Sequence, residues 1–503
     1  MQEKESKLAT PAVQAGAVSS KYDGGDAALD FLAREQEAGV IVDITETKAL
    51  RWKIDLHIMP LLIAIYFLQY LDKTLLNYAA VMGIKQYLKG NEYNNLGTIF
   101  YVGYIVAEPI TAYLMQRFPI GKYLGINVIC WGILVACTAA CRSYASLMVI
   151  RVLLGVFEAS VAPALILITG MWWQKAEQSR RTGLWYMQIG VAQIVGAGIS
   201  YGFQHVHSAK LANWEILFLF MGCLTVIVGV ITVFALPDNP MSAWFLNDKE
   251  KIMAIEHVRV NQTGVENKHF KPHQLVELLF KDKETWPLFF ITLLSMIDNG
   301  AVSNFSSIII ATFGFSTSRT TIIQMPSGAV SIVATFVATY LVGAIGHRSY
   351  IIAALMLPSI LGAGLLLGLD NSHKVGKLFG VYLLNSCPAM LPIIYTWNSA
   401  NTSGYTKRVM RNALTLMAFC VGNLIGPQLF PANDGPNYTP AKAVLMATFV
   451  AVVILSLALR QLIVSENAKR DREQADSGAG DSAADLAFLD LTDIENRQFR
   501  YVY

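Results

Sequence analysis

The sequence is poor in charge. Asp, Glu, Lys and Arg make up 15% of its 503 residues, against roughly 25% in an ordinary soluble domain. Apolar and aromatic residues make up 54%, enough for about twelve membrane-spanning helices of ~20 residues each. A formal net charge of +3 does not favour nucleic-acid binding. These numbers exclude a soluble globular domain and indicate a polytopic membrane protein.

Several chemical signatures are also missing. Six cysteines without a Cys-x-x-Cys pair exclude a disulfide scaffold and a zinc module. We find no Walker A sequence, which argues against an ATP-driven pump. No nucleophile–base grouping and no metal-ligand constellation stand out, so we expect no enzyme activity, no metal and no cofactor. The polar first fifty residues lack the pattern of a cleavable signal peptide.

The apolar runs set the expected fold. They fall in two groups of six, at 56–82, 95–117, 120–141, 146–172, 183–204 and 214–236, then at 286–310, 321–345, 350–369, 376–397, 409–430 and 441–464. We therefore predict an all-α polytopic membrane protein with twelve transmembrane helices in two pseudo-repeated six-helix bundles. The predicted parts are an N-terminal tail (1–55), the first bundle (56–236), a linker (237–285), the second bundle (286–464) and a disordered C-terminal tail (465–503), because its Asp/Ser/Gly/Ala-rich stretch cannot form a core.

A weak internal repeat supports two halves. Tyr113 and Tyr340 each begin a Tyr-Leu pair, and they lie 227 positions apart, as do Arg181 and Arg408 in the basic loops after the fourth span of each half. Lys and Arg in the short loops do not decide the orientation. The basic flanks and the linker favour both termini on the cytoplasmic side.

Ionisable residues inside the predicted spans need an explanation, because each costs at least ~2.5–3.5 kcal/mol to insert. Arg151 and Glu158 are seven residues apart, so they share one helix face but lie ~10.5 Å apart along the axis. They therefore need different partners, which Asp72 or Lys73 of the first span could supply. Glu108 and Asp298 are the other acids in the spans. The competing interpretation is an ion-pair network that only joins helices, and for Glu108 and Asp298 it has equal weight.

Several segments of the sequence are similar to those of a known family. They are Leu68–Thr74, Arg151–Glu158, Leu236–Pro240, Arg259–Gly264, Asn401–Arg408 and Gly422–Pro427. In these segments the chain resembles the major facilitator superfamily, its anion:cation symporter branch and, within that branch, the fungal allantoate permease group. Together the segments run from the first span to the eleventh, so the resemblance covers nearly the whole chain outside the tails.

The resemblance implies proton-coupled uptake of a small organic anion by alternating access. The candidate substrates are allantoate or another ureide, a nicotinate-like carboxylate, or a small peptide. In relatives, an acid and a cation at the positions of Asp72 and Lys73 handle the proton and the substrate, and Arg151 and Glu158 serve the anion path and proton coupling. Much of the wider branch has arginine where this chain has Lys73, and lysine offers a point charge instead of a planar fork.

We therefore predict a transport site inside the bundle. Its substrate-binding residues are Lys73, Arg151, Tyr101, Tyr104, Trp397 and Asn398, and its proton-coupling residues are Asp72, Glu158 and Glu108. We expect a monomer in the plasma membrane whose partners are a small organic anion, a proton and the lipid bilayer, with no nucleic acid. Two alternatives stay open: an exporter of an anionic secondary metabolite with the same fold, and a nutrient sensor that binds the anion without transporting it.

Overall fold

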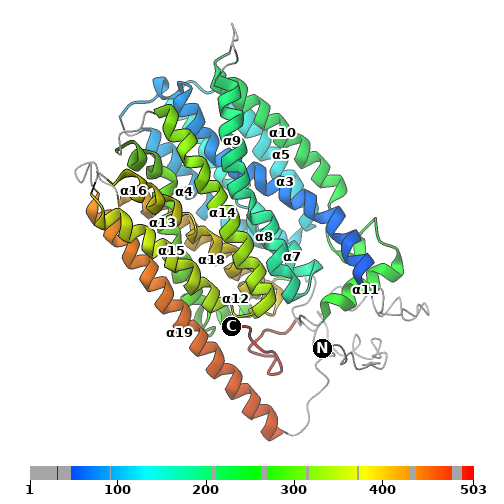
Figure 1. The fold of residues 1–503 in the computed structure, drawn as a ribbon. Helices are drawn as coiled ribbons and strands as arrows, with labels where there is room; N and C mark the ends of the chain where they lie inside the picture. The colour runs from blue at the N-terminus through cyan, green and yellow to red at the C-terminus, as the bar shows by residue number, and fades with distance from the viewer. Residues whose placement is uncertain are drawn as a thin grey trace.

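The computed structural model describes residues 47–90, 92–204, 211–259, 269–312, 317–370, 373–429, 438–477 and 490–503, with the single residues 31, 206 and 261. Helices account for the regular structure of this part of the chain. They form an elongated bundle in which the N-terminal start of α3, helices α11 and α12, and the C-terminal segment lie at one end (Figure 1). We call this end the terminal face and the other end the opposite face.

The first half of the bundle contains eight helices. They are α3 (Thr47–Val81), α4 (Glu92–Arg117), α5 (Ile120–Thr138), α6 (Tyr144–Glu158), α7 (Val161–Trp172), α8 (Lys175–Tyr186), α9 (Gln188–Gln204) and α10 (Asn213–Ala235), with a short 3-10 turn η1 (Ile84–Tyr87). The linker forms η2 (Pro240–Ser242), α11 (Asp248–Arg259) and α12 (Pro272–Phe280).

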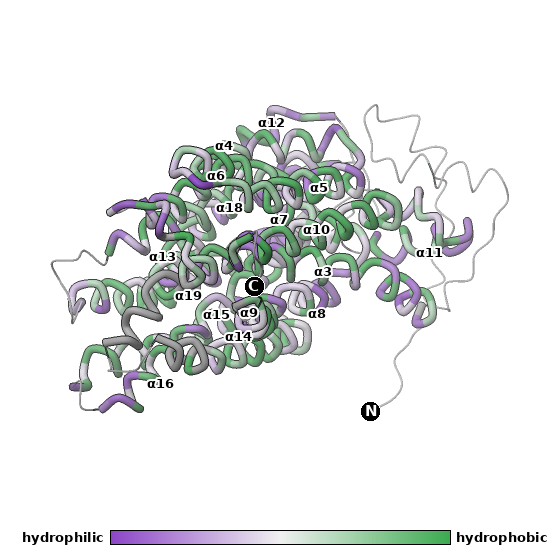
Figure 2. Tube along the Cα trace, turned by 90° about the horizontal axis from the view of Figure 1, so that it is seen from above, coloured by the Kyte–Doolittle hydropathy of each residue, from purple (hydrophilic) through white to green (hydrophobic). Residues whose placement is uncertain are grey.

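The second half repeats this pattern. It contains α13 (Thr285–Thr312), α14 (Thr317–Ile345), α15 (Arg348–Gly368), α16 (Lys374–Leu384), η3 (Cys387–Met390), α17 (Leu391–Asn401), α18 (Tyr405–Gln428) and α19 (Thr439–Ser477). Along the bundle most helices are hydrophobic, whereas hydrophilic residues lie on α11 and at helix ends and connections around the bundle (Figure 2).

Eleven helical stretches of the described residues are long and apolar enough to cross a membrane. The crossing that the sequence predicts at 183–204 is shared by α8 and α9, which are separated at Met187. Each piece alone is too short to meet the length that a crossing needs, but the two follow one another and complete the six crossings of the first half. The predicted all-α fold of two six-helix halves is confirmed.

The helix contacts follow the same rule in both halves. The third and sixth crossings pack together, as α5 with α10 and as α15 with α19. The first and fifth also pack together, as α3 with α9 and as α13 with α18. Between the halves, the second crossing of one half meets the fifth of the other, as α4 with α18 and as α14 with α8 and α9. The pseudo-repeat is thus visible in the packing.

The fourth crossing of each half is interrupted. In the first half, α6 ends at Glu158 and α7 begins at Val161. Pro163 has no N–H to donate to the carbonyl of Ala159, so the continuous ladder is lost at this point. In the second half, Pro388 opens η3 between α16 and α17. Irregular backbone inside a membrane bundle is tolerated where protein surrounds it. The interruption in the first half places Glu158 at the end of α6.

The C-terminal tail differs from the prediction. Helix α19 continues through residue 465 to Ser477, and residues 490–503 pack against the terminal face instead of being disordered. Residues 478–489, which hold most of the Asp/Ser/Gly/Ala-rich stretch, lie outside the described part of the chain. The composition of the tail did not predict the order of residues 490–503, because that order depends on a few residues. Phe499 and Tyr501 supply apolar surface that becomes buried, and Arg470 on α19 binds backbone carbonyls of the segment. Of the predicted N-terminal tail, residues 47–55 belong to α3. Apart from residue 31, its first 46 residues lie outside the described part of the chain.

Candidate functional site

The first charged pair of the site joins α3 to α6. The ammonium of Lys73 lies 3.4 Å from a carboxylate oxygen of Glu158. The Glu158 side chain is completely buried, while 23% of the Lys73 side chain is exposed. The acid that faces Lys73 in this geometry is therefore Glu158.

Lys73 also lies at the boundary between the two halves. Its ammonium is 5.8 Å from the ring centroid of Phe100 on α4 and 5.5 Å from that of Phe419 on α18. Aromatic faces at these distances attract a cation. A movement of the halves relative to one another therefore changes the surroundings of this ammonium.

The second charged pair lies beside the first. Trp131 of α5 donates a hydrogen bond of 3.2 Å from its indole nitrogen to Asp72. Arg151 lies close enough to act on Asp72 electrostatically. Both side chains are buried, so the two cations and two anions of the site form a neutral cluster. First-span residues thus lie beside both Arg151 and Glu158, and Lys73, which forms the ion pair with Glu158, also acts electrostatically on Asp72.

Close helix packing brings α6 to this cluster. The backbone of α4 at Phe100 and Tyr104 occupies the place where a side chain of Gly155 would lie. Because Gly155 has no Cβ, α6 approaches α4 closely and presents Arg151 and Glu158 toward α3. The shared face that the seven-residue spacing predicted is therefore directed into the first half.

The predicted aromatic residues of α4 lie near the cluster. The ring of Tyr101 is 6.3 Å from that of Phe419 across the boundary of the halves. Tyr104 is buried, and its ring lies 6.1 Å from that of Phe100. Phe100, Phe419 and Trp131 were not among the predicted site residues. Phe100 precedes Tyr101, but nothing in the sequence distinguishes these three from other aromatic residues of the spans.

Two predicted residues of the second half lie elsewhere. Trp397 is buried and donates a hydrogen bond of 3.0 Å to the carbonyl of Val502 near the terminal face. Asn398 donates one of 2.7 Å to the hydroxyl of Thr415 within the second half. The structure does not bring either side chain to Lys73, so we leave both out of the site that we propose below.

The remaining acids of the spans stand apart from the cluster. Glu108 is fully buried on α4, eight residues beyond Phe100, or about 12 Å along the helix axis. Its carboxylate accepts no hydrogen bond from the described residues. Asp298 on α13 is buried beside the Cys387 thiol, and its neighbour Asn299 donates to Asn423 at 2.8 Å. Neither acid belongs to the two pairs.

The two halves meet at the terminal face. Gln116 of α4 donates a hydrogen bond of 2.8 Å to Thr406 at the start of α18. Ser179 of α8 donates one of 3.3 Å to Thr396 of α17. All four side chains are buried. These contacts close the bundle on the side of the terminal face.

The linker is fixed to the first half at the same face. Glu177 on α8 contacts Arg51 at 2.8 Å and His257 of α11 at 3.0 Å. Burial opposes its ionisation, but His257 and Arg51 outweigh burial and lower the pKa of Glu177 to about 2. Arg181 binds Asp55 at 2.8 Å in a similar way.

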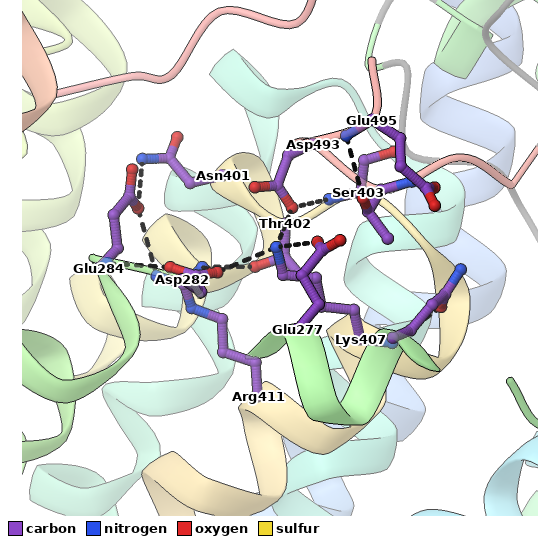
Figure 3. A network of polar contacts seen from close by, with 12 residues as sticks. Glu277, Asp282, Glu284, Asn401, Thr402, Ser403, Lys407, Arg411, Asp493 and Glu495 are labelled. Carbon is purple, nitrogen blue, oxygen red and sulfur yellow. Dashed lines mark hydrogen bonds and ion pairs between the residues drawn. The ribbon is translucent and has the colours of Figure 1, made fainter. Parts of the chain in front are cut away.

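A denser network holds the terminal face of the second half (Figure 3). The fully buried ammonium of Lys407 lies 3.0 Å from Glu277, 3.1 Å from Asp282 and 2.8 Å from Asp493. Arg411 adds contacts of 3.2 Å to Asp282 and to Glu284. Burial opposes the ionisation of Asp282, but Arg411 and Lys407 outweigh it and hold its pKa below the usual range. No group of three or more potential metal ligands occurs among the described residues.

The comparisons with known proteins define the class. Residues 62–427 match the family model described as Major Facilitator Superfamily. The chain therefore belongs to the major facilitator superfamily and is a multi-pass membrane transporter rather than an enzyme.

Among fungal relatives, the chain is 49% identical to the thiamine pathway transporter THI73 of Saccharomyces cerevisiae, over 91% of this chain and 86% of the relative. It is 34% identical to the allantoate permease of the same yeast, over 93% and 88% of the two chains. The predicted membership in this fungal transporter group is confirmed.

Solved structures agree on the fold. The proton:xylose symporter XylE superposes with a TM-score of 0.67 at 13% identity, over 80% of this chain and 95% of XylE. The Escherichia coli fucose:proton symporter FucP superposes with a TM-score of 0.61 at 12% identity, over 80% and 98% of the two chains.

Proposed function

We propose that the chain is a proton-coupled symporter of a small organic anion, with Lys73 as the anion-binding cation and Glu158 as the proton carrier. The observation that carries this proposal is the Lys73–Glu158 ion pair at 3.4 Å, with Glu158 buried and Lys73 partly exposed. A substrate carboxylate can therefore reach the cation, while water has little access to the acid.

The pair couples the two solutes through charge. When a substrate carboxylate takes over Lys73, Glu158 loses the cation that stabilised its ionised form. A buried carboxylate without a partner is costly, so it gains stability by binding a proton. Anion and proton thus enter together and leave the site neutral. Arg151 acts electrostatically on the neighbouring Asp72, and we assign it to the anion's path.

The direction of transport completes the proposal. We infer that the terminal face is cytoplasmic, which agrees with the basic flanks and linker, and that the chain works as a monomer in the plasma membrane. The described structure is then closed on the cytoplasmic side. Alternating access would open this side after the loaded site has closed to the outside.

The substrate class includes the allantoate-like, nicotinate-like and small-peptide anions that the family resemblance implies. The similarity to THI73 favours a second candidate, a compound of the thiamine pathway, because identity to that relative is 49% against 34% for the allantoate permease. Thiamine itself is a cation, for which Lys73 would be a repulsive neighbour. Competition by thiamine and by allantoate therefore separates the two candidates.

The test uses proteoliposomes with an imposed pH gradient. Labelled allantoate, nicotinate and a dipeptide are offered first, and the anion that accumulates is used with the variants. Glu158→Gln should abolish gradient-driven accumulation but retain exchange of labelled for unlabelled substrate, because glutamine mimics the protonated acid. Glu256→Gln, a change in the linker, is the matched control and should behave as wild type.

Other outcomes would overturn parts of the proposal. Accumulation by Glu158→Gln equal to wild type removes the proton-carrier role. Anion transport that occurs only when the imposed proton gradient is directed outward supports the exporter instead. Binding of an anion without any flux supports the sensor.

A further inference from the structure

The C-terminal residues 490–503, which we call the clasp, return from beyond α19 to the terminal face of the bundle (Figure 1). Several of their side chains are almost completely enclosed, with exposed fractions of 0% for Thr492, 1% for Asp493 and 1% for Phe499. A terminal segment with no task would not be expected to bury two polar residues and an aromatic ring, because ordering each residue costs conformational entropy of about 1–2 kcal/mol.

Acidic side chains attach the clasp to the second half and to the linker. Asp493 contacts Lys407 at 2.8 Å and accepts a hydrogen bond from the backbone N–H of Ser403 at 3.3 Å (Figure 3). Asp490 contacts Lys271, just before α12, at 2.7 Å and accepts from the backbone N–H of Tyr405 at 2.6 Å. These contacts place the clasp over the loop between α17 and α18.

Backbone groups of the clasp are bound as well. Arg470 of α19 donates to the carbonyls of Asp493 at 3.0 Å and of Phe499 at 2.9 Å. Asn401 and Val502 exchange two hydrogen bonds, of 3.0 and 2.8 Å. The clasp is therefore an integral part of the second half and should move with it.

At Phe499 the clasp reaches the first half. The ammonium of Lys175, at the start of α8, lies 4.3 Å from the centroid of the Phe499 ring. Burial and the neighbouring cation Arg348 lower the pKa of Lys175 to about 7, whereas Asp493 of the clasp and Glu284 of the second half favour its charged form. The first half thus inserts a lysine against a surface that the clasp completes. The same end of α8 carries Ser179, whose contact with Thr396 closes the terminal face.

We propose that the clasp is a built-in latch that stabilises the conformation closed at the terminal face, by presenting Phe499 to Lys175. Opening this face separates the halves and must break the contact, whereas the bonds between the clasp and the second half can persist. The proposal rests on alternating access, which is part of the function proposed above, but not on the substrate or on the proton carrier.

The test measures opening directly. Ser179→Cys, in a chain whose six native cysteines are replaced, puts a thiol at a buried contact between the halves. Its reaction rate with a maleimide reports how often the terminal face opens in the purified full-length protein, without substrate or pH gradient. Phe499→Ala should raise this rate roughly three- to tenfold, as expected for the loss of a partly desolvated cation–π contact. Arg500→Ala is the matched control, because it removes contacts with Asp471 and Gln474 of α19 and with the Phe499 carbonyl but leaves the Phe499 ring in place.

A second variant separates latching from folding. Lys175→Gln removes the partner in the first half without touching the packing of the clasp, and it should raise the rate by a similar factor. The double variant should open no faster than either single variant, because both changes break one contact. Unchanged rates in both single variants, or independent multiplying effects in the double variant, would overturn the proposal.

The result does not depend on the proposed substrate or on the proposed proton carrier. If Phe499→Ala opens faster, the latch is supported whether or not transport by the protein proves to be coupled to protons. Loss of coupling in Glu158→Gln with an unchanged labelling rate in Phe499→Ala would support the proton carrier and contradict the latch.

Discussion

The central site and the terminal-face network are both buried clusters of charge, but they are saturated to different degrees. Lys407 has three carboxylates within 3.1 Å. In the central site, Lys73 forms an ion pair with one carboxylate among the described residues, that of Glu158 at 3.4 Å. A saturated cluster resists change, whereas a loosely held pair can exchange its partners. We therefore expect the terminal-face network to stabilise the fold and the central site to exchange the proton and the anion.

The largest expected effect concerns the central site. Lys73→Gln should reduce anion accumulation in proteoliposomes to the level of empty liposomes, because the substrate loses its cation. Its apparent melting temperature should stay close to that of wild type, since the ion pair with Glu158 is loose and glutamine can still hydrogen-bond. Lys89→Gln, an exposed lysine at the end of the same segment, is the control for both measurements. A stable variant with wild-type affinity would exclude the role of Lys73.

The reverse pattern is expected at the terminal face. Lys407→Gln leaves Glu277, Asp282 and Asp493 without their shared cation, and breaking a buried pair in this way costs about 3–5 kcal/mol. Thermal unfolding in detergent should show a clear drop in melting temperature. The fraction that stays folded should still bind the anion. Wild-type stability in this variant would mean that the network is not what holds this face together.

A smaller effect is expected where the halves meet at the site. Phe419→Leu removes one of the two rings beside Lys73, a contact of about 0.5–1 kcal/mol. The Kd for the anion should change by roughly two- to fivefold, whereas Phe289→Leu, on α13, should leave it unchanged. Equal binding by wild type and Phe419→Leu would place this ring outside the substrate path.

The smallest effect concerns pH. Because the pKa of Glu177 is lowered to about 2 from its ordinary value of 4.5, its stabilising contribution is complete above the ordinary value and is lost as pH falls from about 4.5 toward 2. The difference in melting temperature between wild type and Glu177→Gln should therefore be larger at pH 7 than at pH 3. A difference that does not change with pH would show that the contacts of Glu177 with Arg51 and His257 do not stabilise its charge.

Much of the fold could be predicted from the sequence because membrane crossing leaves a strong signal. Apolar runs located the helices and the linker between the two halves. The cost of burying charge identified Asp72, Lys73, Arg151 and Glu158 as residues that need partners. The break between α8 and α9 at Met187 was not predictable in the same way, since no proline or charge marks it.

The pairing within the site was harder to predict. Helical spacing shows that Arg151 and Glu158 share a face, but not how α6 is rotated against α3, so it does not predict which acid forms the ion pair with Lys73. Trp397 was misleading because its indole binds the backbone of Val502, about a hundred positions away. The clasp was missed because its order depends on Lys407 and Arg470, which lie outside it, and not on its own composition.

Proton uptake on substrate binding tests the central claim most directly. Purified protein in weakly buffered solution is mixed with the anion that raises its melting temperature, allantoate or nicotinate, and a pH-sensitive dye records protons bound. Our account predicts that wild type takes up about one proton per anion bound near neutral pH, and that Glu158→Gln binds the anion without taking up a proton. Anion binding by wild type without proton uptake, or equal uptake by Glu158→Gln, would contradict the exchange of partners between Lys73 and Glu158.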